Sequence, residues 1–405
     1  MVAPEPPWPS THGGRVDTWN RCDGLSREGW SVGLICWSDE PRDAAAKAAK
    51  NFSRVFDWVR VLEEPRGPAG LAGRLLRLTH QPSITTALHL AKRKLDGIIS
   101  EAREFGPQLI VADTVYTATF ARKIADALAV PLLIRSHNVE HEYMAIQYRL
   151  ASSWRQRLSV GAARLHLKTY EIKALRGADG VLEISRDALP FWRGHGVERV
   201  EWVPTFLPGL QHARRGTIPW TARRYDAVYV GNLWSPNNVT AVRWLVDDVM
   251  PHVRLQAPDF VLMIAGSNPA ADLQAVLSLA ENVVWQANPV DAAAVRAEGR
   301  VLVNPILEGS GLNTKSIEML FSDSPLVMTP FAAKGMDADT QDCFDLQPDP
   351  EGFAAAMVRQ AAFPFTLDSA RREARERFGA VGARKLSTIL ADVANRGTRS
   401  SGGPR

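Results

Sequence analysis

The chain has 405 residues, of which 45% are hydrophobic and 23% are charged, which is ordinary for a soluble globular protein and excludes a mainly disordered one. The formal net charge of +4 comes from 48 basic and 44 acidic residues, a balance too even to predict nucleic-acid binding. The length exceeds one ordinary compact domain and suits two domains of roughly 150 to 200 residues each.

The cysteines are Cys22, Cys36 and Cys343, which are widely spaced and odd in number. This pattern argues against a disulfide framework or a zinc site and favours a reducing cytoplasm. No apolar run reaches the roughly 18 residues that a membrane span needs, and the N-terminus lacks a signal-peptide pattern. The sequence therefore predicts a cytoplasmic protein.

Short apolar runs alternate with longer helical patterns in the first half of the chain, as is typical of a parallel α/β sheet. The predicted strands lie at 30–37, 108–113, 130–136 and 178–185, and predicted helices cover 85–105 and 116–128. The opening "MVAPEPPWP" becomes proline-rich almost at once. The first strand is therefore expected to be very short, or the natural start lies upstream.

A glycine pair, Gly13 and Gly14, lies in "STHGGR" (10–15). A plain turn is the more economical interpretation. The alternative is a loop whose unshielded amides approach a phosphate at the start of the next helix, with Arg15 adding positive charge.

The stretch "RSHNVEHEY" (135–143) directly follows a predicted strand. His137 and His141 are spaced as in a zinc-protease helix, but Asn138 follows the first histidine and breaks the required order. Hydrogen bonding to a substrate is therefore favoured over a metal site.

Residues 150–176 form a basic helical stretch. Such a run is usually a solvated face. An interfacial membrane contact through Trp154, Leu158 and the basic residues is the alternative.

Residues 204–225 contain prolines and glycines without a clean period, which predicts an interdomain linker. A second α/β series follows, with strands at 226–232, 260–266, 283–285, 300–306 and 324–329, and helices near 238–255, 271–280 and 291–297. The expected organisation is a Rossmann-like domain at 1–205, a second at 206–370, a helical segment at 371–395 packing back on the first domain, and a disordered tail at 396–405. Two doubly wound domains would face each other across a cleft and bind ligands beyond the carboxyl ends of their strands.

The stretch "VGNLWSPNN" (230–238) ends a predicted strand and turns into a helix. The simpler interpretation is structural, with Ser235 or Asn237 capping the helix, while Gly231 and Asn232 are the candidate donor-binding residues. The sharper one places a nucleotide phosphate near the Gly231 amide.

The stretch "EGSGLNTKSIEML" (308–320) resembles a phosphate loop, but Thr314 stands where a Walker loop needs its second glycine. Gly309 and Gly311 still leave amides open before a predicted helix, which favours an anion site. Lys315 would neutralise a diphosphate there, and Glu318 would share its helix face. An ordinary surface ion pair is the alternative.

The sequence resembles family-4 glycosyltransferases of the group 1 type, which have the GT-B fold of two Rossmann-like domains. The resemblance covers most of the chain, and the order and spacing of its motifs carry it together. The motifs are "PPWPSTHGGR", "IRSHNVEHEY", "YVGNLWSPNNVTAVRWL", "FVLMIAGSNP" and "PILEGSGLNTKSIEMLFSDSPLVMT".

The resemblance implies a retaining hexosyltransferase-like enzyme that moves a sugar from a nucleotide-diphosphate donor without a metal or other cofactor. The acceptor would be a polysaccharide, a lipid-linked sugar or a metabolite, with peripheral contact to the inner face of the membrane for a lipid-linked acceptor. His137 would lie beside the transferred sugar, Glu308 would approach that sugar and Glu318 would bind the ribose hydroxyls. The donor-binding set is Gly13, Gly14, Arg15, Gly231, Asn232, Gly309, Ser310, Gly311, Leu312, Lys315 and Glu318.

The sequence also departs from the family pattern. The separation between Glu308 and Glu318 is longer than usual, and "GNLWSPNN" lacks the Arg and Lys that many relatives place near the diphosphate. Two alternatives therefore stay open: a non-catalytic scaffold of the same fold, and a nucleotide-sugar epimerase. A nicotinamide oxidoreductase is disfavoured because no acceptable glycine fingerprint occurs.

Overall fold

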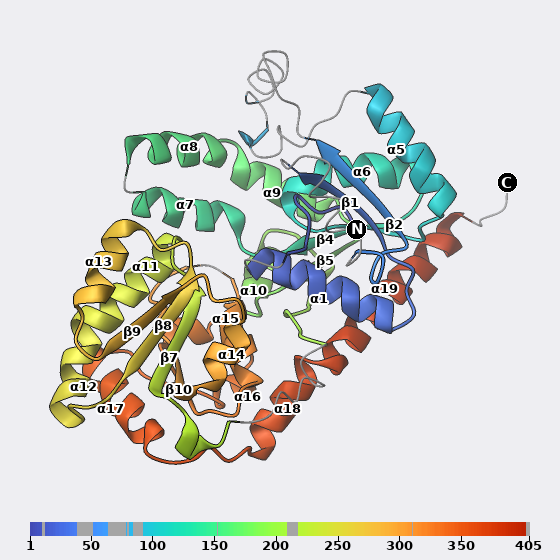
Figure 1. The fold of residues 1–405 in the computed structure, drawn as a ribbon. Helices are drawn as coiled ribbons and strands as arrows, with labels where there is room; N and C mark the ends of the chain where they lie inside the picture. The colour runs from blue at the N-terminus through green and yellow to red at the C-terminus, as the bar shows by residue number, and fades with distance from the viewer. Residues whose placement is uncertain are drawn as a thin grey trace. The chain divides into compact units, whose positions relative to one another are not determined.

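The computed structural model describes residues 1–9, 13–38, 52–63, 78, 81–83, 92–151, 153–208, 218–309 and 311–401 (Figure 1). The chain divides into two compact units. The first comprises Met1–Pro208 and Ala380–Arg405, and the second comprises Gly209–Gly379.

The first unit contains parallel strands in the order β1–β2 and β3–β4–β5–β6. Their bounds are β1 (Gly33–Ser38), β2 (Trp58–Glu63), β3 (Ile110–Ala112), β4 (Leu132–Ser136), β5 (Gly180–Glu183) and β6 (Val200–Trp202). The predicted runs at 30–37, 108–113, 130–136 and 178–185 coincide with β1, β3, β4 and β5. β2 and β6 have no counterpart among the predicted strands, because β2 is half exposed and β6 spans only Val200–Trp202.

The start of the chain joins these two groups of strands. Val2 bridges Ile35 of β1 and Ala112 of β3, both in parallel. The Val2 amide donates to the Val111 carbonyl at 2.8 Å, and the Ala3 amide donates to the Ile35 carbonyl at 2.9 Å. One bridging residue thus takes the position of a strand between β1 and β3, which explains why "MVAPEPPWP" carries almost no strand pattern.

Eight α-helices are described in the first unit. They are α1 (Gly13–Arg27), α5 (Lys92–Phe105), α6 (Ala118–Leu128), α7 (Glu140–Leu150), α8 (Trp154–Arg164), α9 (Leu167–Arg176), α10 (Ala188–Gly194) and α19 (Ala380–Ser401). α19 lies against α1, where a Cβ on Gly24 would come within 2.8 Å of the Phe206 ring and 3.1 Å of the Ala383 Cβ. The glycine thus permits this close packing. The sequence predicted a disordered tail at 396–405. In the structure α19 continues to Ser401, through a stretch that contains no proline.

The second unit is built on one parallel sheet in the order β12–β11–β10–β7–β8–β9. The strands are β7 (Tyr225–Asn232), β8 (Leu262–Ser267), β9 (Val283–Ala287), β10 (Gly299–Asn304), β11 (Leu326–Met328) and β12 (Asp345–Leu346). The helices are α11 (Pro236–Arg243), α12 (Met250–Gln256), α13 (Ala271–Leu279), α14 (Ala292–Ala297), α15 (Thr314–Leu320), α16 (Ala338–Gln341), α17 (Pro350–Ala361) and α18 (Ser369–Arg377).

Two details of the second unit differ from the sequence-based expectation. A π-helical segment at Trp244–Val249 separates α11 from α12, and it ends just before Pro251, which has no N–H to continue an α-helical ladder. The unit also extends to Gly379 rather than ending at residue 370. Arg371 on α18 explains this extension, because its guanidinium donates to the carbonyls of Leu320 and Ser324 at 3.0 and 2.7 Å.

Candidate functional site

Glycines shape the described part of the turn between β10 and α15. Gly311 has φ +73°, in the left-handed region that favours glycine, and the Leu312 side chain is buried. A Cβ on Gly309 would lie 3.1 Å from the side-chain nitrogen of Asn237, so a larger residue would crowd α11. Glu308 precedes this turn and is partly exposed. Ser310 lies outside the described residues.

Asn313 caps the N-terminus of α15, a role that the sequence did not indicate. Its side-chain oxygen accepts from the Lys315 amide at 3.2 Å, and its carbonyl accepts from the Ser316 amide at 3.0 Å. The amides of Lys315 and Ser316 in the first turn of α15 are therefore already satisfied. Because α15 spans only Thr314–Leu320, side chains rather than the helix end must supply most of the recognition.

The Lys315 ammonium is directed toward β7 and α11. It donates to the Tyr229 hydroxyl at 2.9 Å and to Asn238 Oδ1 at 2.7 Å, and it lies 4.9 Å from the centroid of the Tyr229 ring. Burial lowers the pKa of Lys315 to about 7, against a smaller opposing effect of Glu318. A Cβ on Gly231 would come within 2.5 Å of the Tyr229 hydroxyl oxygen and 3.2 Å of this ammonium, so glycine leaves room for the contact between them.

Glu318 pairs with Arg296 on α14, with Nη1 and Oε2 3.1 Å apart. Their side chains are only 17% and 19% exposed, so the pair is held close to the protein surface with little solvent around it. Arg296 is absent from the site residues predicted from the sequence. It belongs to a short alanine-rich helix, and only the packing of α14 beside β10 brings it to Glu318.

Asn232 organises the loop after β7. Its Oδ1 accepts from the amides of Trp234 and Ser235 at 3.1 and 2.9 Å, and its carbonyl accepts from Asn238 at 2.7 Å. These bonds make a tight Asx turn. Ser235 stands at the N-cap position of α11, as expected, but its side chain makes no capping hydrogen bond there. The same loop presents Trp234, which is 58% exposed.

Gly13, Gly14, Arg15 and His137 all belong to the first unit. The two glycines form the first turn of α1 instead of a free loop. Arg15 is bound to Glu5, with Nε and Oε2 2.7 Å apart, so its charge is partly neutralised within the unit. His137 follows β4, and its Nε2 lies 2.8 Å from the Asp113 carbonyl oxygen.

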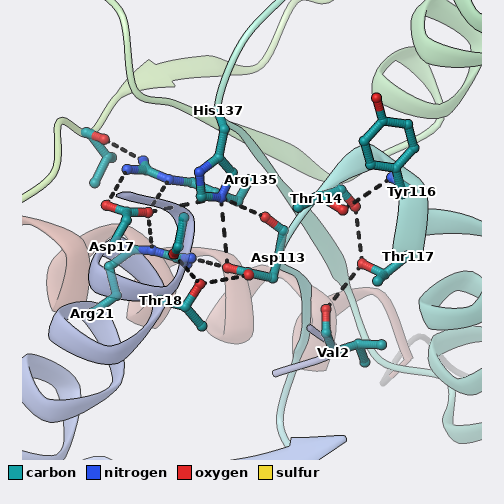
Figure 2. A network of polar contacts seen from close by, with 12 residues as sticks. Val2, Asp17, Thr18, Arg21, Asp113, Thr114, Tyr116, Thr117, Arg135 and His137 are labelled. Atoms are coloured by element: carbon teal, nitrogen blue, oxygen red, sulfur yellow. Dashed lines mark hydrogen bonds and ion pairs between the residues drawn. The ribbon is translucent and has the colours of Figure 1, made fainter. Parts of the chain in front are cut away.

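Beneath His137 lies a buried network of two arginines and two aspartates (Figure 2). Arg135 donates to both Asp17 oxygens at 3.2 and 3.0 Å, and Arg21 binds Asp17 at 2.9 Å and also Asp113. His137 Nε2 is 3.9 Å from one oxygen of each carboxylate. The network fixes the ends of β3 and β4, and thereby the backbone that carries His137.

Burial alone would raise the pKa of both aspartates, but the arginines override it. Arg135 and Arg21 hold the pKa of Asp17 well below its usual range. Arg21, with hydrogen bonds from His137 and Thr18, lowers the pKa of Asp113 to about 2. Both carboxylates therefore stay ionised at neutral pH. Asp113 directly follows the buried strand β3, which is the sequence signal that could have identified it, whereas Asp17 lies on α1 and carries no such signal.

The second histidine of "RSHNVEHEY" has a different partner. His141 Nδ1 lies 2.6 Å from Glu171 Oε2, while His137 contacts Asp113. Glu140 lies between them in the chain, and burial raises the pKa of its carboxyl to about 7. Within the described ranges, no group of three or more His, Cys, Asp or Glu residues is arranged to hold a metal ion.

Residues 224–362 match the family described as "Glycosyl transferases group 1". The matched range contains Arg296 and every candidate residue of the second unit. Among solved structures, the chain is similar to Anabaena HepE in complex with UDP and glucose, with a TM-score of 0.60 and 12% identity over 96% of this chain and 98% of that one. Sucrose-phosphate synthase from Thermosynechococcus elongatus gives a TM-score of 0.65 and 14% identity over 97% and 98%.

The chain has the GT-B fold. A Klebsiella pneumoniae protein described as "Uncharacterized 44.6 kDa protein in cps region" is 24% identical over 349 residues, 83% of each chain. The GT-B fold confirms the fold class predicted from the sequence. None of the described helices has both the length and the apolar character that a membrane span requires.

Proposed function

We propose that the protein is a retaining glycosyltransferase that moves a sugar from a nucleotide-diphosphate donor to a polysaccharide, lipid-linked or metabolite acceptor. The observation that carries the proposal is the arrangement of Lys315, Glu318 and Arg296 around the β10–α15 turn, inside the range that matches group 1 glycosyltransferases. The similarity to Anabaena HepE, whose crystal structure is also known in complex with UDP-glucose, supports a donor of this class.

Each part of the donor has a chemically suited partner in this proposal. The Glu318 carboxylate, oriented by Arg296, accepts hydrogen bonds from the ribose hydroxyls, while Lys315 and the backbone near Gly311 and Leu312 face the diphosphate. Glu308 approaches the donor sugar. Breaking the anomeric bond places negative charge on the leaving diphosphate, so a fixed cation stabilises the transition state more than the ground state. No metal is assigned a role.

His137 of the first unit acts on the transferred sugar in the proposed mechanism. Its Nε2 donates to the Asp113 carbonyl, which fixes the ring plane. The imidazole then orients a sugar hydroxyl, and the Gly13 and Gly14 backbone lies near the donor. We place the activity in the cytoplasm, which the buried free thiols of Cys22 and Cys36 support.

Nucleotide-sugar binding should raise the thermal unfolding midpoint selectively. A ligand at about 100 times its Kd adds roughly 2.7 kcal/mol to the free energy of unfolding, which shifts the midpoint by a few degrees. The measurement compares UDP, GDP, ADP and dTDP, alone and as common sugar conjugates. A rise with one base supports the transferase and identifies the nucleotide. A flat response across the panel contradicts the proposal and favours the non-catalytic scaffold, whereas sugar interconversion without an acceptor would indicate the epimerase.

Donor binding should take up a proton at Lys315. The pKa of Lys315 is about 7 in the protein without donor. A neighbouring diphosphate favours the charged ammonium and therefore raises this pKa. Donor affinity should therefore fall as pH rises above about 7, by up to tenfold per unit. Calorimetry in buffers of different ionisation enthalpy measures the uptake directly. A sugar conjugate is the right ligand, because its diphosphate does not titrate near neutral pH.

Lys315→Met should remove both the affinity and its pH dependence. Lys334→Met, at an exposed lysine of the same unit, is the matched control and should leave both unchanged. Wild-type protein whose binding enthalpy is the same in every buffer would show that Lys315 does not change its protonation on binding.

A further inference from the structure

Helices α7 and α8, with the residue that ends α8, expose large apolar side chains. Trp154, Leu158, Leu165 and Tyr148 are 68%, 65%, 52% and 38% exposed. Val381 is the only other exposed large hydrophobic residue in the described part of the first unit. Isolated exposed apolar residues are ordinary, but a concentration of this kind on neighbouring helices marks an interaction surface.

The spacing places three of these side chains on one face. Leu158 follows Trp154 by one helical turn, and Leu165 follows Leu158 by two more. The opposite face of α8 packs inward through Ala163, which is 6% exposed, and Leu167 at the start of α9 is 0% exposed. Folding of the unit therefore does not need the exposed stripe. α8 runs beside α7 on the outside of the unit (Figure 1).

The charge around the stripe has one sign. Residues 143–170 contain no Asp or Glu. The basic residues of this range are Arg149, Arg155, Arg157, Arg164 and Lys168, all of them exposed. Two of the arginines lie over exposed rings, with Arg155 5.4 Å from the Trp154 centroid and Arg164 5.0 Å from that of Tyr148. The acidic residues that flank this range are Glu142, which is exposed, and Glu171, which is buried.

We propose that this surface, defined by Tyr148, Trp154, Leu158, Leu165 and the five basic residues, docks onto an anionic phospholipid membrane. Trp154 and the two leucines would enter the boundary between headgroups and acyl chains, and the arginines would bind the lipid phosphates. Charge complementarity selects this partner. A second copy meeting through the same face would oppose cations with cations, whereas an anionic bilayer neutralises all of them.

The docking does not depend on sugar transfer, so it and the proposed function can fail separately. Where both hold, the membrane would bring the protein to a lipid-linked acceptor. Of the polysaccharide, lipid-linked and metabolite acceptors in the proposed function, the lipid-linked acceptor would then be favoured.

Vesicle co-sedimentation of the full chain tests the proposal. The protein should pellet with phosphatidylcholine vesicles containing phosphatidylglycerol and not with phosphatidylcholine alone, and added salt should weaken the binding. The double variant Trp154→Ser/Leu158→Ser should reduce the bound fraction at least about tenfold, because it removes the inserted apolar area. Arg155→Glu/Arg157→Glu should abolish the preference for anionic lipid.

The matched control is Leu255→Ser/Leu279→Ser, at two residues of the second unit that are 84% and 85% exposed; it should pellet like the wild type. Wild-type protein that remains in the supernatant with anionic vesicles overturns the proposal, as does normal pelleting of the Trp154→Ser/Leu158→Ser variant. An oligomer that this variant dissociates, without vesicle binding by the wild type, would assign the surface to a protein interface instead. The thermal response to the donor should be equal in all variants, which separates docking from donor recognition.

Discussion

Glu318→Ala should raise the Kd for the donor at least about 100-fold, the largest expected effect on binding. A carboxylate that accepts from two ribose hydroxyls contributes two charge-assisted hydrogen bonds, each about 1.5–3 kcal/mol. The substitution also leaves Arg296 without its carboxylate partner next to the β10–α15 turn. Calorimetric titration with the nucleotide sugar selected by the thermal panel measures the change.

The control for this variant is Glu281→Ala, since Glu281 belongs to the same unit but its side chain is 80% exposed. It should bind the donor like the wild type. Arg296→Lys should retain most of the affinity and Arg296→Met should lose about tenfold, because the cation orients Glu318 without itself holding the ribose. Wild-type affinity in Glu318→Ala would remove the central residue of the proposed donor site.

The candidate site shows what a sequence pattern can and cannot predict. Lys315 and Glu318 were identifiable because they lie together in one motif after a predicted strand. Arg296 was not, because its distance in sequence hides a contact that exists only once α14 packs beside β10. The direction of the Lys315 ammonium was also beyond prediction, since Tyr229 and Asn238 come from separate elements.

The fold was more accessible than the site. Strongly apolar runs such as 130–136 and 260–266 predicted β4 and β8 because strands buried on both faces need continuous hydrophobic sequence. The strand position that Val2 fills has no such apolar run. The hydrophobic pattern there lies in the neighbouring strands β1 and β3, which Val2 bridges. The buried charges of Arg21 and Arg135 could be noticed but not paired, because Asp17 and Asp113 meet them only in three dimensions.

Arg135→Met should destabilise the first unit by about 3–5 kcal/mol, the largest expected effect on stability. Removing one partner of a buried ion pair leaves the other charge poorly compensated, and Arg21 would be the one arginine left to Asp17. Hydrogen exchange of the β3 and β4 peptides, followed by mass spectrometry, reports on this unit separately from the second. Arg60→Met is the matched control, because the Arg60–Glu101 pair spans 3.1 Å at 50% and 36% exposure and should contribute at most about 1 kcal/mol.

The pH dependence of that difference follows from the carboxylates. Arg135 and Arg21 hold the pKa of Asp17 well below its ordinary 3.8, whereas the lowered pKa of Asp113 depends on Arg21, which the variant keeps. A carboxyl whose pKa is lowered by folding stabilises the fold at pH values above its pKa in the unfolded chain. This contribution is lost as the pH falls through its pKa in the folded chain. The wild-type advantage over Arg135→Met should therefore be full at neutral pH and shrink below about pH 4. Two results would show that the network does not hold β3 and β4 together through charge. One is a loss of stability in Arg135→Met no larger than that in Arg60→Met, and the other is a loss that does not change with pH down to about 2.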